Sequence, residues 1–112
     1  MRVLASSEVE TYLEQNPVSV LMFGASWCMP CKALKPKVER LGEQFPHVPL
    51  AYCNVEEHAT LVAELEIMSV PTVVAMVDGE GTEEVVGTSE DRIRKLFATC
   101  GDMIAVRSGL GG

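Results

Sequence analysis

The sequence predicts a single α/β domain: a mixed five-stranded sheet flanked by four helices, in the order βαβαβαββα. Three observations predict this class. The length of 112 residues suits one hydrophobic core and is too short for two. Short apolar runs alternate with amphipathic helical patterns, which is typical of parallel strands joined by right-handed crossovers. A Gly-containing turn between two late strand-like runs indicates an antiparallel hairpin at one edge.

The N-terminal part is expected to form a strand, a helix and a second strand. Residues 2–5 predict the first strand. Ser6 or Ser7 is the expected helix cap, because Glu10 follows Ser7 at the spacing of a capping box. Residues 18–23 are nearly all apolar, which predicts a buried strand covered on both faces. The helix between these two strands has its apolar positions at Val9, Tyr12 and Leu13.

A long amphipathic helix is expected after residue 28, because apolar residues recur there at helical spacing. Pro36 interrupts this helix and is expected to bend it, since a mid-helix proline removes a backbone hydrogen bond. Residues 50–55 then predict a third strand and residues 57–66 a third helix. The apolar positions of the long helix are Leu34, Val38, Leu41 and Phe45.

The C-terminal part is expected to form a hairpin and a last helix. Residues 72–77 and 82–86 predict the two hairpin strands, joined by a turn over residues 78–81. Ser89 is the expected cap of the last helix. The apolar positions of that helix are Ile93, Leu96, Phe97 and Cys100.

The chain carries 9 basic and 16 acidic residues, a net charge of −7. This charge disfavours nucleic acid and anionic membrane as partners. No apolar run is long enough to span a bilayer, and the first residues lack a signal-peptide pattern. We therefore expect a cytoplasmic monomer. The domain is expected to span 1–106, with 107–112 as a flexible C-terminal tail.

The segment Ser26-Trp27-Cys28-Met29-Pro30-Cys31-Lys32 places two cysteines where the buried strand ends and the long helix begins. Cys28 then lies at the helix N-terminus, where unpaired N–H groups and the helix dipole stabilise a thiolate by about 0.3–1 kcal/mol. Cys28 is therefore the expected nucleophile. Cys31, almost a turn further along, is the group expected to resolve a mixed disulfide. Pro30 suits the first helical turn.

Two other uses of the pair remain as alternatives. A zinc site usually needs four ligands, but Cys53 and Cys100 stand alone and His47 and His58 form no second ligand pair, so we expect no metal. A structural disulfide across so short a loop adds little stability. Thiol exchange is the favoured use, and the other two cysteines are interpreted as buried small apolar residues.

These motifs resemble the thioredoxin family over about residues 2–101. The matching stretches are residues 23–32, Pro36, Val70-Pro71-Thr72, Asp78-Gly79 and Val86-Gly87. The resemblance implies the thioredoxin fold and a thiol–disulfide oxidoreductase that reduces protein disulfides. It also implies that no cofactor is bound, and that electrons arrive from NADPH through a recycling reductase of the thioredoxin-reductase type.

The resemblance also implies roles for residues around the cysteines. Pro71 is implied to be cis and to face the disulfide, and Val70 to offer backbone hydrogen bonds to an extended substrate segment. Trp27 is implied to be a partly exposed platform and Gly87 a surface of close approach. For Trp27, Pro71 and Gly87 a purely structural role remains the alternative. The implied substrate-binding residues are Trp27, Met29, Pro30, Val70, Pro71 and Gly87.

Three positions depart from the family pattern. Met29 replaces the usual Gly and adds a flexible apolar side chain beside Cys28, which alters partner choice and redox poise. Met22 replaces a commonly buried Asp that moves a proton to or from the resolving cysteine. Tyr52 replaces the Lys that accompanies this Asp, so acid and partner are lost together. We therefore expect Cys31 to be deprotonated through water or a substrate group, and to attack more slowly near neutral pH.

Two other function classes remain open. One is an adaptor that binds partners through Trp27, Val70 and Pro71 with little turnover. The other is a carrier of zinc or an iron–sulfur cluster held between two chains by Cys28 and Cys31. The acidic group Glu8, Glu10 and Glu14 is interpreted as a solvated helix face. The basic group Lys32, Lys35 and Lys37 is interpreted in the same way, with steering of acidic partners as the alternative.

Overall fold

The computed structural model describes residues 1–109. The strands are β1 (Arg2–Val3), β2 (Val18–Gly24), β3 (Leu50–Asn54), β4 (Thr72–Val77) and β5 (Glu80–Val86). The α-helices are α1 (Val9–Gln15), α2 (Met29–Glu43), α3 (Ala59–Glu64) and α4 (Glu90–Arg107), and two 3₁₀ turns are η1 (Ser6–Glu8) and η2 (Val55–Glu57). This order confirms the predicted succession of strands and helices.

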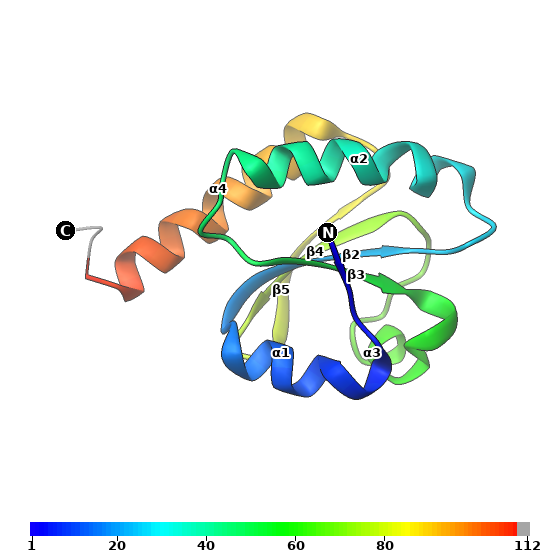
Figure 1. The fold of residues 1–112 in the computed structure, drawn as a ribbon, viewed down its shortest axis with the longest axis horizontal. Helices are drawn as coiled ribbons and strands as arrows, with labels where there is room; N and C mark the ends of the chain where they lie inside the picture. Colours follow the sequence, from blue (N-terminus) through cyan, green and yellow to red (C-terminus); the bar gives the residue numbers. More distant parts are fainter. Residues whose placement is uncertain (110–112) are drawn as a thin grey trace.

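The five strands form one mixed sheet in the order β1-β3-β2-β4-β5. β1, β3 and β2 are parallel, β4 is antiparallel to β2, and β5 is antiparallel to β4. Helices α2 and α4 cover one face, and α1 and α3 cover the other (Figure 1). The predicted arrangement of parallel strands with an antiparallel hairpin at one edge is confirmed. No helix within residues 1–109 is long and apolar enough to cross a membrane.

Strand β2 is buried along its whole length and divides the core into two layers. Successive side chains of a strand point to opposite faces. Met22 therefore packs with Leu34 of α2 in the layer below α2 and α4, whereas Leu21 and Phe23 pack in the layer above α1 and α3. The carboxyl end of this buried strand leads directly to the start of α2, which fixes the place of the cysteine pair.

The first helix starts differently from the prediction. The turn η1 precedes α1, and no serine hydroxyl caps either element. Instead, the Glu8 carboxylate accepts a hydrogen bond from the Ala5 backbone N–H at 2.8 Å. The predicted Ser7–Glu10 capping box is wrong because the helical turn begins at Ser6, with Ala5 as its N-cap. Glu8 supplies the carboxylate half of a capping box, and Ala5 has no side-chain acceptor to supply the other.

Several other elements are shorter than predicted. β1 ends at Val3 rather than at residue 5, and β3 ends at Asn54 rather than at residue 55. The helix expected over residues 57–66 is divided into η2 and α3. The hairpin turn is only Asp78 and Gly79, so Glu80 and Gly81 already belong to β5. Both turn residues have positive φ, 53° and 84°, which an Asp-Gly pair adopts more readily than most residues.

Helix α4 confirms its predicted cap, because the Ser89 side chain accepts a hydrogen bond from the Arg92 N–H at 3.3 Å. Its far end extends to Arg107, whose guanidinium donates two hydrogen bonds to the Asp78 carboxylate at 2.9 and 2.7 Å. Arg107, expected in the tail, is thus the last residue of the helix. Residues 110–112 of the predicted tail lie outside the described residues, where the tail stays a prediction.

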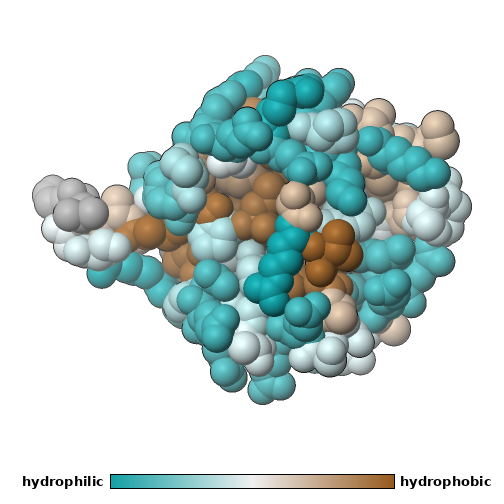
Figure 2. Space-filling view, in the orientation of Figure 1, coloured by the Kyte–Doolittle hydropathy of each residue, from teal (hydrophilic) through white to brown (hydrophobic). Residues whose placement is uncertain are grey.

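The face that carries the N-terminus has hydrophobic surface between hydrophilic regions above and below it (Figure 2). Val3 of the edge strand β1 is 54% exposed. Because β1 is only two residues long, it offers few unpaired backbone groups to another strand. This edge therefore ends the sheet with little opportunity for further strand pairing.

Candidate functional site

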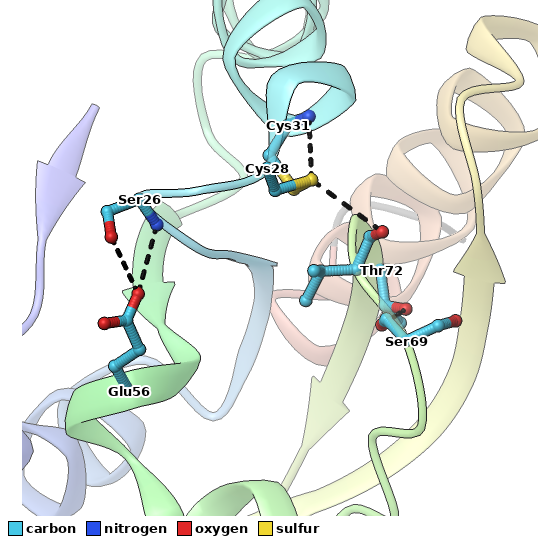
Figure 3. Close-up of a disulfide and its surroundings, with 7 residues drawn as sticks. Ser26, Cys28, Cys31, Glu56, Ser69 and Thr72 are labelled. Carbon is cyan, nitrogen blue, oxygen red and sulfur yellow. Dashed lines mark hydrogen bonds between the residues drawn. A yellow bond between two sulfur atoms is a disulfide. The ribbon is translucent and has the colours of Figure 1, made fainter.

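The cysteine pair lies between the carboxyl end of β2 and the start of α2 (Figure 3). Cys28 and Cys31 form a disulfide, with their Cα atoms 5.3 Å apart. Cys28 is the N-cap of α2, and the Cys31 backbone N–H donates to its Sγ at 3.2 Å. Pro30 occupies the first turn, where its missing N–H leaves no hydrogen bond unmade. The predicted position of the pair is confirmed.

The surroundings of Cys28 favour a negative charge on its sulfur once the disulfide is reduced. The first turn of α2 contains no acidic residue, and the helix dipole and the Cys31 N–H both stabilise an anion at that place. Cys31 is 1% exposed and Cys28 is 5% exposed. Cys31 is therefore shielded, as predicted, and a partner can reach only a small surface of Cys28.

A loop before β4 faces the disulfide. The Val70–Pro71 peptide bond is cis, which confirms the conformation implied by the sequence. The Val70 carbonyl oxygen lies 3.9 Å from the Cys28 Sγ. The Pro71 carbonyl accepts a hydrogen bond from the Gly87 N–H at 2.9 Å, and Gly87 has φ of 100°. The fold thus brings Val70, Pro71 and Gly87 to the site, and the left-handed backbone at Gly87 favours glycine there.

Two large apolar side chains stand exposed beside the buried sulfurs. Trp27 and Met29 are each 69% exposed, on either side of Cys28 in the sequence. The exposure implied for Trp27 is confirmed, whereas its role as a platform for a substrate stays a prediction. Exposed apolar surface at a site with reactive groups is typical of a surface that contacts another protein.

Trp27 also borders a shallow groove that the sequence did not predict. The groove runs from Trp27 to Met68, which is 92% exposed. Its only charged lining residues within the described chain are Glu56 and Glu66. Ile67 and Met68, two apolar residues just before Val70-Pro71, are the sequence signal that could have indicated it. The apolar lining residues are Trp27, Val55, Ala59, Val62, Ala63, Ile67 and Met68.

The loop before Cys28 is held by a second element. The Ser26 backbone N–H and hydroxyl both donate to one oxygen of the Glu56 carboxylate, at 3.3 and 2.8 Å (Figure 3). Glu56 belongs to η2, thirty residues away in the sequence. These hydrogen bonds tie the approach to the redox pair to the η2 turn. No sequence pattern links two residues so far apart.

Two of the family departures are neighbours in the sheet. Met22 of β2 pairs in register with Tyr52 of β3, so both side chains point to the face below α2. Met22 is fully buried. The Lys35 ammonium lies 4.5 Å from the centre of the Tyr52 ring, a cation–π distance. Burial, and secondarily the nearby Cys53 and Glu56 side chains, raises the pKa of Tyr52, so its phenol stays neutral near pH 7.

Tyr52 also explains the glycine at the end of β2. A Cβ atom on Gly24 would overlap the Tyr52 hydroxyl. The aromatic ring therefore occupies space that a side chain at position 24 would otherwise fill. Gly24 and Tyr52 are matched to each other, and this match was not predicted from the sequence.

The other residues weighed as metal ligands do not join the Cys28–Cys31 pair in a cluster within the described residues. Within residues 1–109, no three His, Cys, Asp or Glu side chains are placed to hold a metal ion. His58 is buried and its Nε2 lies 2.7 Å from the Leu4 carbonyl oxygen. Cys53 and Cys100 are free thiols in different core layers. Their predicted burial is confirmed.

Comparison with known proteins gives a consistent result. A family model described as Thioredoxin matches residues 1–99. Thioredoxin-1 of Saccharomyces cerevisiae is 29% identical over 93 residues, 83% of this chain and 90% of the relative. Thioredoxin-3 of the same yeast, a mitochondrial protein, is 30% identical over 89 residues, 80% of this chain and 70% of the relative. The solved thioredoxin of Fasciola hepatica aligns with a TM-score of 0.80 at 31% identity, covering 88% of this chain and 98% of that one.

The two buried free thiols should make the folded protein less stable at alkaline pH. Burial raises the pKa of Cys53 to about 12 and of Cys100 to about 11, from an ordinary 9.0. As the pH rises above about 9, the unfolded chain releases these protons while the folded protein keeps them. The free energy of unfolding should therefore fall, by about 1.4 kcal/mol per pH unit for each thiol.

Urea unfolding of the oxidised protein at several pH values between about 8 and 10.5 measures this slope. The double variant Cys53→Ala/Cys100→Ala is the control, because every other titrating group is retained. Its free energy of unfolding should fall less steeply with pH. Equal slopes for the two proteins would contradict the prediction.

Proposed function

The chain belongs to the thioredoxin family, and from this premise we propose that its Cys28–Cys31 pair reduces disulfide bonds in protein substrates. As a member of the family it is a thiol–disulfide oxidoreductase. The proposal rests on the position of the two cysteines, at the N-terminus of α2 and facing the Val70 carbonyl. The structure holds the pair as a disulfide, which is the state after a substrate has been reduced.

Cys28 is the proposed nucleophile. Its thiolate attacks one sulfur of the substrate disulfide, a mixed disulfide forms, and the other substrate sulfur leaves as a thiolate. The Cys31 N–H and the helix dipole stabilise the attacking thiolate before this step. The nearly complete burial of Cys28 restricts attack to a disulfide presented at the narrow exposed surface beside Trp27 and Met29.

Cys31 completes the reaction. Its thiol loses a proton, its thiolate attacks the Cys28 sulfur, and the second substrate sulfur leaves as a thiolate. Two electrons have then passed from the cysteine pair to the substrate. Met22 and Tyr52 offer no carboxylate below α2 to accept the Cys31 proton. We therefore propose that water or a substrate group accepts it.

Substrate recognition is proposed to combine backbone and apolar contacts. Within the described residues, the Val70 N–H and carbonyl make no backbone hydrogen bond, which leaves both for an extended substrate segment. Trp27 and Met29 supply the exposed apolar surface on the other side. Pro30, Pro71 and Gly87 are proposed to shape the surface between them.

We also propose where the electrons come from and in which compartment the protein acts. A recycling reductase returns electrons from NADPH to the disulfide, and the protein itself binds no cofactor and acts as a monomer. Two thiols, Cys53 and Cys100, remain free, which fits a reducing compartment such as the cytoplasm. Since one similar yeast protein is mitochondrial, that compartment is the natural alternative.

One observation favours a second candidate, an adaptor that binds partners with little turnover. Met22 leaves the resolving step without a buried acid, whereas the contact surface at Trp27, Met29 and Val70 is intact. Such a protein would capture disulfide partners and release them slowly. Turnover distinguishes the adaptor from the reductase.

Catalysed reduction of insulin by dithiothreitol tests the proposed activity. Wild-type protein should accelerate the reaction, and Cys28→Ser should reduce the rate to the uncatalysed level because the nucleophile is lost. Cys53→Ala is the control, and should keep the wild-type rate. Cys31→Ser should accumulate mixed disulfides that are visible on a non-reducing gel. No acceleration by the wild type, together with trapping by Cys31→Ser, would instead support the adaptor.

Met22→Asp tests the missing proton acceptor. A carboxylate at this position should speed release of the mixed disulfide near neutral pH by roughly tenfold or more. The same change should lower the free energy of unfolding by about 2–4 kcal/mol, because the new carboxyl is buried without a partner. Met22→Asn is the matched control, since its amide is similar in size and accepts no proton at this pH. Equal release rates for the two variants would reject the proposed role of an acid here.

A further inference from the structure

Charge is divided unequally between the two faces of the sheet. Eight of the nine basic residues belong to α2 and α4, and only Arg2 lies elsewhere. Eleven of the sixteen acidic residues lie outside those two helices, on α1, α3, β5, the 3₁₀ turns and the loops beside them. The net charge of −7 therefore comes from the residues outside α2 and α4, among them those of α1 and α3.

A groove of about 820 Å³ lies between α1 and α3. That volume is within the range of ligand-binding clefts. Its largest apolar side chains are Val9, Leu13 and Leu61, and each also packs against the core layer below. Pro17 and Ala59 line it as well. The groove therefore has a fixed apolar floor.

Four carboxylates border this floor: Glu10 and Glu14 on α1, Glu57 at the end of η2, and Glu64 on α3. None of the four forms a salt bridge within residues 1–109. At one end, by contrast, Asp78 is neutralised by Arg107. The unpaired carboxylates give the groove a negative potential that a cationic ligand would relieve.

We propose that this groove, between α1 and α3, docks a basic amphipathic segment of a partner protein. Lys or Arg side chains of the segment pair with Glu10, Glu14, Glu57 and Glu64, and its apolar side chains rest on Val9, Leu13 and Leu61. The segment then contacts both the unpaired carboxylates and the apolar floor of the groove. A small cation would satisfy the carboxylates and leave the apolar floor uncovered, and no three of the acidic side chains are placed to hold a metal ion within the described chain.

Although it shares one lining residue, Ala59, with the groove beside Trp27, this groove is distinct from the redox site. Pro17 and Gly79 line one end of it, and Pro17 precedes β2 whereas Cys28 follows it, so this end and the disulfide lie at opposite ends of the strand. The groove and the loop Val70-Pro71 share no residue. A segment docked here leaves Cys28 accessible, so binding goes beyond the redox activity and does not depend on it.

A synthetic peptide with Lys and Leu alternating at helical spacing is the probe. Its binding to the oxidised protein is measured by fluorescence anisotropy, and its site by changes in backbone amide NMR shifts. We expect saturable binding, with shifts concentrated on α1, η2 and α3. A second peptide with every Leu replaced by Ser keeps the charge and should bind several-fold more weakly.

Two double variants locate the site. Glu10→Gln/Glu14→Gln should weaken binding by about fivefold, as expected for the loss of two exposed charge pairs. Glu43→Gln/Asp102→Asn removes the same charge from α2 and α4 and should change affinity by less than about twofold. Thr60→Trp, which adds bulk at an exposed lining position without changing charge, should also weaken binding. All three variants should reduce insulin at the wild-type rate.

The alternative outcomes each overturn the proposal. Equal weakening by both double variants would indicate general attraction to a negative protein. Shifts centred on Trp27 and Val70 would assign the peptide to the redox surface. Equal affinity for the Ser peptide, or full displacement by spermine, would indicate a cation site without an apolar component, and absence of saturable binding would exclude a docking site.

Discussion

The Cys31 backbone N–H, in the first turn of α2, donates to the Cys28 sulfur, and the other parts of the redox site are placed around this contact. The buried strand β2 ends just before Cys28. In the loop between them, Ser26 donates a hydrogen bond to Glu56. The Cys31 N–H donates to the sulfur at 3.2 Å, and the Val70 carbonyl lies on its other side at 3.9 Å. The Cys31 N–H and the helix dipole therefore stabilise a thiolate there without a buried cation.

The layer below α2 has the opposite character, because it contains no charge next to the strand that carries the site. Met22 is fully buried, its register partner Tyr52 is a neutral phenol, and Gly24 makes room for the Tyr52 ring. A buried carboxylate would be costly here, since only the partly buried Lys35 approaches, and it lies over the ring. In the proposed reaction, the helix terminus assists the attack by Cys28, whereas Met22 provides no carboxylate to accept the proton of Cys31.

The features that the sequence could predict are those set by local pattern. The buried apolar run of β2, the helical spacing in α2 and α4 and the Asp78-Gly79 turn each depend on neighbouring residues. The succession of strands and helices along the chain could therefore be predicted from them. Contacts between distant residues left no such pattern. The Ser26–Glu56 and Gly24–Tyr52 contacts, the Arg107–Asp78 pair and the groove between α1 and α3 arise only when the folded elements meet. The Ser7 cap failed for a local reason, because the Glu8 carboxylate accepts from the Ala5 N–H and the helical turn starts before Ser7.

The central claim is that the start of α2 makes Cys28 the reactive thiol. Its most direct test is the rate at which each cysteine of the reduced, folded protein is alkylated by iodoacetamide near neutral pH, followed by mass spectrometry. Cys28 should react first, roughly ten times faster than Cys31 or more, while Cys53 and Cys100 stay unmodified in the core. Equal rates at Cys28 and Cys31, or faster reaction at Cys31, would contradict the claim.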